Sequence, residues 1–123
     1  MRQRVMCVLL AGVVTASCGG SGYSTGPSAN PIPAGPTTVL VPNGAYAGPG
    51  PGFAPVSLTV AAGTTVTWGN NDSTAHTATA DGGQWNSNAI SAGKTFTFKF
   101  DAPGTYKYHC TIHSFMNGTI VVQ

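Results

Sequence analysis

The sequence predicts an all-β protein folded as an antiparallel β-sandwich. Glycine and proline are abundant, with 17 and 9 of the 123 residues, and they mark many turns. Apolar residues alternate with threonine and other polar residues over several short segments, which is the period of a half-buried strand. The folded part lacks the helical period. About seven or eight short strands at this spacing are typical of a sandwich, and the length fits one domain.

The first 17 residues have the pattern of a signal peptide. Two arginines precede an apolar run, Val5 to Val14, that is too short to span a bilayer. The next residue, Cys18, resembles the acylated cysteine of bacterial lipoproteins, although Thr15 stands where those signals usually carry leucine. Ordinary cleavage after Ser17 is the alternative. We therefore predict an exported protein of the periplasm or cell envelope, attached to a membrane by a lipid on Cys18.

Residues 18–36 are rich in glycine, serine and proline, and we expect a flexible tether leading to a domain at 37–123. The precursor has a net charge of +2, but three lysines balance three aspartates once the signal is removed. A chain without a basic or acidic excess is not expected to bind nucleic acid or to steer a charged partner. We expect a monomer.

The first half of the domain contains three predicted strands. Thr38–Val41 is the first, and the Gly/Pro-rich excursion Pro42–Gly52 after it fits no regular structure. In the next strand, alternation places Val56, Leu58 and Val60 on one face.

The third strand, residues 64–68, is expected to turn Val66 and Trp68 inward. Residues 70–73 are then predicted to form a polar loop that leads to His76. A weak strand is expected at 77–80.

The second half has the clearest alternation. Trp85 and Ile90 are expected to anchor an irregular segment in the core. Residues 95–100 place three phenylalanines on one face, and residues 119–123 form the last strand.

The strand Thr105–Cys110 carries the most informative residues. Tyr106 and Tyr108 share its inner face with Cys110, whereas His109 points to the outer face. We therefore exclude His109 from the site, although it is adjacent to Cys110 in the chain.

Four side chains form a candidate metal-binding set: His76, Cys110, His113 and Met116. Cys110 ends an inward-facing strand, so a short loop can turn His113 and Met116 toward the same point. A thiolate, two imidazoles and a weak thioether form the ligand set of blue copper electron-transfer sites. Structural zinc sites usually have more thiolates or histidines and no methionine. Alone, His76 would be a polar loop residue and Met116 core filler.

Two stretches resemble the cupredoxins, and in particular their plastocyanin and amicyanin branch. The first is Thr64-Thr-Val-Thr-Trp-Gly-Asn70, which leads to His76, and the second is Tyr106-x-Tyr-His-Cys-Thr-x-His-x-Phe-Met116-x-Gly118. The short loop of the second stretch is similar to that of amicyanin. The resemblance covers about residues 37–123.

The resemblance implies a Greek-key β-sandwich with one type 1 copper at one end. The implied ligands are His76, Cys110, His113 and Met116. It also implies that His113 passes the electron through an apolar patch that includes Ala75, Ile112 and Phe115, where redox protein partners dock.

One departure from the family concerns the residue after the first histidine. Thr77 stands where the family often has asparagine, and its backbone N–H can still donate to the Cys110 sulfur. The amide side-chain link between the two ligand loops is expected to be missing.

The function predicted is that of an electron carrier, with copper binding and delivery as the alternative. Delivery would favour additional exposed methionine or histidine ligands, and the mature chain has no methionine besides Met116. We do not expect an enzyme. A multicopper oxidase needs additional histidine clusters, and a binuclear copper electron entry site needs a second cysteine beside Cys110, and neither is present. A metal-free adhesion sandwich would leave the four ligands unexplained.

Overall fold

The computed structural model describes residues 31–47, 50 and 52–123. The predicted signal peptide at 1–17, the acylated Cys18 and most of the tether lie outside these residues and stay predictions. Within the described part of the chain, no helix is long and apolar enough to cross a membrane.

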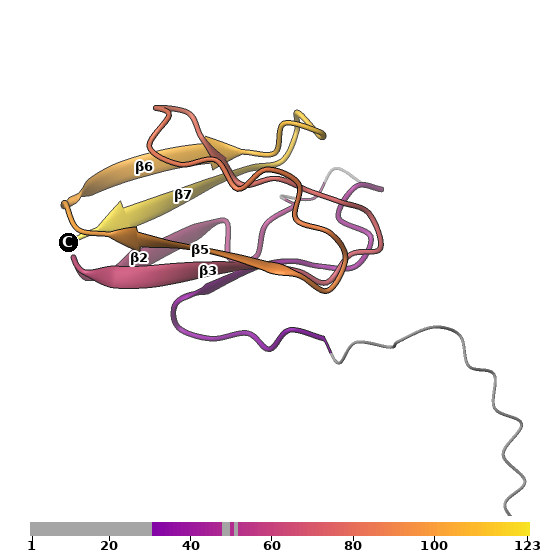
Figure 1. Cartoon of the computed structure of the whole chain (residues 1–123), viewed down its shortest axis with the longest axis horizontal. Helices are drawn as coiled ribbons and strands as arrows, with labels where there is room; N and C mark the ends of the chain where they lie inside the picture. Colours follow the sequence, from indigo (N-terminus) through magenta and orange to yellow (C-terminus); the bar gives the residue numbers. More distant parts are fainter. Residues whose placement is uncertain (1–30, 48–49, 51) are drawn as a thin grey trace, which may run out of the picture.

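Two β-sheets pack face to face, as the two layers of Figure 1 show. One sheet has the order β1-β3-β5 and the other β2-β7-β6-β4. The strands are β1 Thr38–Val41, β2 Ser57–Val60, β3 Thr64–Asn70, β4 Thr79–Ala80, β5 Thr95–Phe100, β6 Gly104–His109 and β7 Asn117–Val122. The prediction of an all-β sandwich is confirmed.

Strand pairing is more mixed than the predicted antiparallel pattern. β1 pairs with β3, and β2 with β7, in parallel, whereas the other neighbours are antiparallel. The parallel pairs arise because β1, β2 and β3 alternate between the two sheets, so β1 and β3 run in the same direction. The Pro42–Gly52 excursion therefore belongs to the crossover from the first sheet to the second.

The core between the sheets is largely aromatic. Trp68 is completely buried, and its ring centroid lies 5.5 Å from that of Trp85 and 5.6 Å from that of Tyr108. Trp85, Ile90 and Val66 are buried as predicted. The contact between Trp68 and Tyr108 joins β3 of one sheet to β6 of the other.

The outward position of Val56 differs from the prediction. Val56 precedes β2 and its side chain is 45% exposed, whereas Val60 is buried. The alternation fails there because Val56 comes before the regular strand, although its carbonyl still accepts a hydrogen bond from Thr119 N–H at 2.9 Å.

Candidate metal centre

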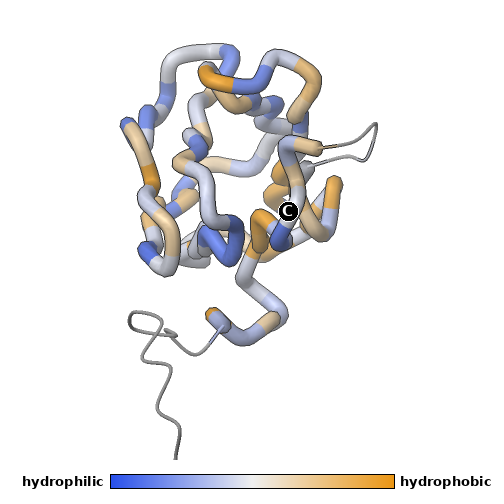
Figure 2. Tube along the Cα trace, turned by 90° about the vertical axis from the view of Figure 1, so that its right-hand side faces the viewer, coloured by the Kyte–Doolittle hydropathy of each residue, from blue (hydrophilic) through white to orange (hydrophobic). Residues whose placement is uncertain are grey.

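The candidate ligands are brought together at one end of the sandwich by connections from both sheets. Cys110 directly follows β6, and His76 lies in the connection between β3 and β4. The His76 backbone is held by paired hydrogen bonds with Ile90, at 3.2 and 2.7 Å. Figure 2 looks onto this end, where the connecting loops are nearest the viewer.

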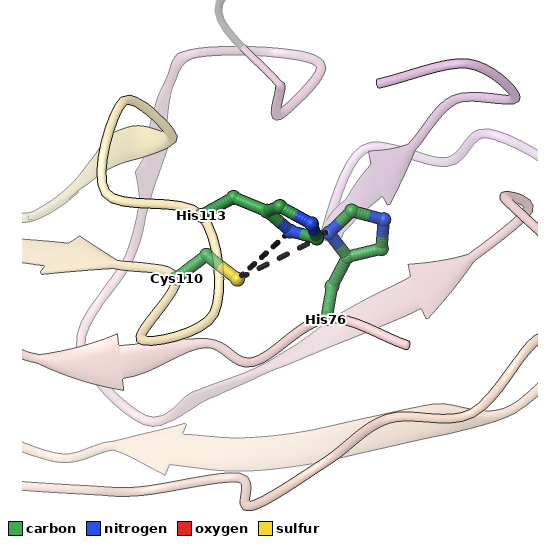
Figure 3. Close-up of side chains that lie close together, drawn as sticks. All are labelled: His76, Cys110 and His113. Atoms are coloured by element: carbon green, nitrogen blue, oxygen red, sulfur yellow. Dashed lines mark hydrogen bonds between the residues drawn. The ribbon is translucent and has the colours of Figure 1, made fainter. Parts of the chain in front are cut away.

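Three of the ligand atoms converge. Cys110 Sγ lies 4.0 Å from His76 Nδ1 and 3.8 Å from His113 Nδ1, and the two Nδ1 atoms are 3.1 Å apart. Figure 3 shows the two imidazoles and the sulfur facing one another, with His76 on a different segment from the other two. All three potential ligand atoms lie within 4.8 Å of each other, which is compact enough to surround one metal ion.

Burial distinguishes the two histidines. His76 and Cys110 are fully buried, whereas His113 is only partly buried. The exposed Tyr46 ring stacks on His113 with centroids 6.3 Å apart, and Phe115 lies 6.1 Å from it on a tilted plane. His113 therefore links the interior of the centre to the surface.

Met116, the fourth predicted ligand, is also fully buried. Its carbonyl accepts a hydrogen bond from Cys110 N–H, and its N–H donates to the carbonyl of His113, both at 3.0 Å. These bonds close the loop that carries the two residues. Gly52 packs against the Met116 side chain so closely that a Cβ at this position would overlap it.

Thr77 links the two ligand loops through both its backbone and its side chain. Its N–H donates to Cys110 Sγ at 3.3 Å, as anticipated. In addition, its hydroxyl oxygen accepts a hydrogen bond from Thr111 N–H at 2.8 Å. The amide is absent, as expected, but the side chain at position 77 still joins the two ligand loops through its hydroxyl.

Asp72 was missed by the sequence analysis, which placed it in a polar loop. It is almost completely buried, and its Oδ2 lies 2.8 Å from His76 Nε2. Burial raises its pKa, but the hydrogen bonds from His76, Gly44 and Ser73 outweigh this effect, so the pKa lies below its ordinary value. One signal was present: Asp72 is the only charged residue between positions 37 and 80.

The side chain of Asn70 makes hydrogen bonds that stabilise the polar segment around Asp72. It is fully buried as the last residue of β3, and its amide donates to the carbonyls of Thr74 and Ile90, both at 2.8 Å. Its Oδ1 accepts from Asp72 N–H at 2.9 Å. In the segment before His76, Asn70 and Asp72 are therefore buried and hydrogen-bonded, while Ser73 remains exposed.

His109 lies outside the cluster, as strand alternation predicted. Its Nδ1 is 2.6 Å from Asp81 Oδ1 in a partly exposed pair. Tyr108, the preceding residue on the inner face, is buried with its ring over Gly118, which leaves no room there for a Cβ. Alternation along β6 thus separates Cys110 from its histidine neighbour.

Comparison with known proteins identifies the family. A family model described as a cupredoxin-like domain matches residues 27–122, so the chain belongs to the cupredoxin-like family. It is 32% identical over 96 residues to amicyanin-alpha of Methylorubrum extorquens, covering 74% of this chain and 75% of that protein. It is 39% identical over 84 residues to plastocyanin of Scenedesmus fuscus, covering 58% and 86%. The resemblance drawn from the sequence motifs is confirmed.

Solved structures of related fold include a small protein and a larger enzyme. A purple cupredoxin from Nitrosopumilus maritimus matches with a TM-score of 0.66 and 34% identity, covering 71% of this chain and 99% of that chain. A copper-containing nitrite reductase from Thermus scotoductus matches with a TM-score of 0.60 and 27% identity, but only 25% of that chain is covered.

Proposed function

We propose that this protein carries single electrons through a mononuclear type 1 copper site formed by His76, Cys110, His113 and Met116. The observation that carries the proposal is the convergence of Cys110 Sγ with the Nδ1 atoms of His76 and His113. This donor set fits copper, because thiolate and thioether sulfur suit Cu(I) and imidazole nitrogen suits both oxidation states. Bound copper would supply a one-electron redox centre.

The surrounding residues would hold this donor set nearly fixed. Thr77 donates its N–H to the sulfur and ties its own loop to Thr111, while Ile90 holds the backbone of His76. Ligands that move little between oxidation states favour fast electron exchange, since less reorganisation accompanies each transfer. The relationship to amicyanin and plastocyanin supports the same role.

Spectroscopy of the copper-loaded domain tests the site. Addition of Cu(II) should give an intense blue thiolate-to-copper band that a reductant bleaches, with an electron paramagnetic resonance signal from one copper per chain. The Cys110→Ser variant should lose the band completely. A blue band that survives this substitution would reject the ligand assignment.

For the docking surface we propose the apolar side chains around His113. Ile112 and Phe115 are 51% and 46% exposed, and the prediction of docking near them is supported by Tyr46, which is 49% exposed beside the same imidazole. An exposed apolar cluster around a partly buried ligand fits a partner with a complementary apolar surface.

Substitution of one apolar residue on each of two faces tests this assignment. Phe115→Asp should slow electron transfer to a redox protein partner while the copper spectrum stays unchanged. The control is Val56→Asp, because Val56 is 45% exposed and lines a groove with Asp81 and Lys107. If Val56→Asp slows electron transfer and Phe115→Asp does not, the partner docks at the Val56 groove and not around His113.

We also propose that the protein is exported, anchored through Cys18, and not an enzyme. The signal-like residues 1–17 support export. Mass spectrometry of the mature N-terminus should find a lipid on Cys18, and an unmodified cysteine there would contradict the anchor. The copper-loaded protein should not reduce nitrite. If it readily donates Cu(I) to an acceptor protein instead of exchanging electrons, the copper-delivery alternative holds.

A further inference from the structure

The carboxylate of Asp72 uses each oxygen for a different part of the molecule. Oδ1 accepts hydrogen bonds from the backbone N–H groups of Ser73 at 2.8 Å and Gly44 at 3.1 Å. Oδ2 faces Nε2 of His76 at 2.8 Å, and both side chains are shielded from solvent. Because a carboxylate oxygen accepts hydrogen bonds, this contact favours the His76 tautomer in which Nε2 carries the proton and donates.

We propose that Asp72 is a positioning residue of the centre, which locks His76 in the Nε2–H tautomer so that the Nδ1 lone pair faces Cys110 and His113. This inference rests on the proposed copper site. A metal binds an imidazole nitrogen that carries no proton, and the hydrogen bond at the other nitrogen selects which one is free. His76 Nδ1 is the atom that faces the sulfur, so the opposite tautomer would present an N–H to the metal.

The same carboxylate connects the Pro42–Gly52 excursion to the centre. Its bond from Gly44 N–H holds the turn in which Ala47 N–H donates to Gly44 O at 3.0 Å. This turn carries Tyr46, which stacks on His113. Asp72 therefore orients His76 directly. Through the turn at Gly44 it also supports Tyr46, which stacks on His113.

The Asp72→Asn substitution provides a sharp test, because the new side chain is isosteric but has only one accepting oxygen. If that oxygen keeps the bonds from Ser73 and Gly44, the amide N–H₂ faces His76 Nε2. The imidazole would then have to accept there and move its proton to Nδ1. Asp72→Ala removes the hydrogen-bond partner of His76 without imposing the other tautomer. A purely structural role predicts the opposite order, since Asp72→Ala deletes more atoms than Asp72→Asn.

The experiment compares wild type, Asp72→Asn and Asp72→Ala without metal and with Cu(I). Long-range proton–nitrogen correlation spectra of the metal-free proteins, at a pH where His76 is neutral, report its tautomer. We expect Nε2–H in wild type and Nδ1–H in Asp72→Asn. Competition with a Cu(I) chelator should give about 10–100-fold weaker binding for Asp72→Asn and a smaller loss for Asp72→Ala.

The matched control is Asp81→Asn, which removes the same charge from the partly exposed pair with His109. It should leave both the His76 tautomer and Cu(I) affinity unchanged. The inference is overturned if metal-free wild type has His76 protonated on Nδ1, or if Asp72→Asn binds Cu(I) as tightly as wild type. Should Asp72→Asn fail to fold, the wild-type tautomer decides the question.

These outcomes are distinguishable from failure of the proposed function. A wild-type protein with the Nε2–H tautomer but no blue copper spectrum would uphold the action of Asp72 on His76 and reject the type 1 site. A blue spectrum with the Nδ1–H tautomer in the metal-free protein would uphold the site and reject the role of Asp72.

Discussion

The two histidines of the centre both face Cys110, but the residues on their other sides differ in burial. Both Nδ1 atoms face Cys110 Sγ, at 4.0 and 3.8 Å. Beyond this point, His76 is fully buried against Asp72, whereas His113 is partly buried between the exposed rings of Tyr46 and Phe115.

This difference separates two tasks within one site. The His76 side is fixed by hydrogen bonds to groups that are themselves buried, so it is suited to holding the ligand geometry. The His113 side is bordered by aromatic rings that meet solvent, so it is suited to contact with a partner. A small domain can then fix the geometry of its centre and still expose one edge of it.

The largest effect should come from truncating the histidines themselves. His76→Gly and His113→Gly should each nearly abolish the blue band of the copper-loaded protein. Added imidazole should restore the band only in His113→Gly, because that position opens to the surface. Equal restoration in both variants would break the distinction between a sealed and an accessible ligand.

A smaller but still large effect, here on the free energy of unfolding, is expected at Gly52, which packs against the buried Met116 side chain. Gly52 has φ of 71° and contacts Met116, so Gly52→Ala combines backbone strain of about 1–2 kcal/mol with overpacking of about 1–3 kcal/mol. The control is Gly63→Ala, where φ is 87° but the added Cβ meets no atom within 4 Å. Urea unfolding of the metal-free proteins measures both. Similar losses would mean that Met116 can move aside.

The hydrogen bond from Thr111 N–H to the Thr77 hydroxyl, which joins the two ligand loops, should contribute less to stability. Thr77→Val keeps the shape but leaves Thr111 N–H without its acceptor, at a cost of about 1–3 kcal/mol in the free energy of unfolding. Thr79→Val removes a partly buried hydroxyl that lies 3.2 Å from Thr77 Oγ1 and 3.3 Å from the exposed Asn86 Oδ1, and it should cost less because no buried backbone group loses its partner. Chemical unfolding without metal checks the order, and a greater loss for Thr79→Val would show that the link is unimportant.

The smallest effect on stability is expected on the exposed side. Tyr46→Ala removes a ring that is about half exposed and stacks on His113, which should cost about 0.5–1.5 kcal/mol at most. The blue spectrum should not change, while electron transfer to a redox partner should slow. A shifted copper spectrum would mean that Tyr46 helps to hold the ligand geometry.

Much of the fold followed from alternation along the strands. It placed Trp68 and Tyr108 inside, and it separated Cys110 from His109, because successive side chains of a strand point to opposite faces. It failed at Val56, which lies just before β2, where the alternation no longer applies. It also could not assign the Pro42–Gly52 excursion, in which the described residues Gly44 and Gly52 contact residues distant in the chain, Asp72 and Met116.

The sequence by itself determined which donor atoms are available. The spacing of Cys110, His113 and Met116 and the single cysteine of residues 37–123 already indicated a copper ligand set. Tertiary structure alone decided what surrounds these ligands. The sequence suggested a polar loop that includes Asp72, and folding buries the carboxylate of this residue against His76 and Gly44. The physical reason is that burial and hydrogen-bond partners depend on packing across the sheets, which local sequence patterns do not encode.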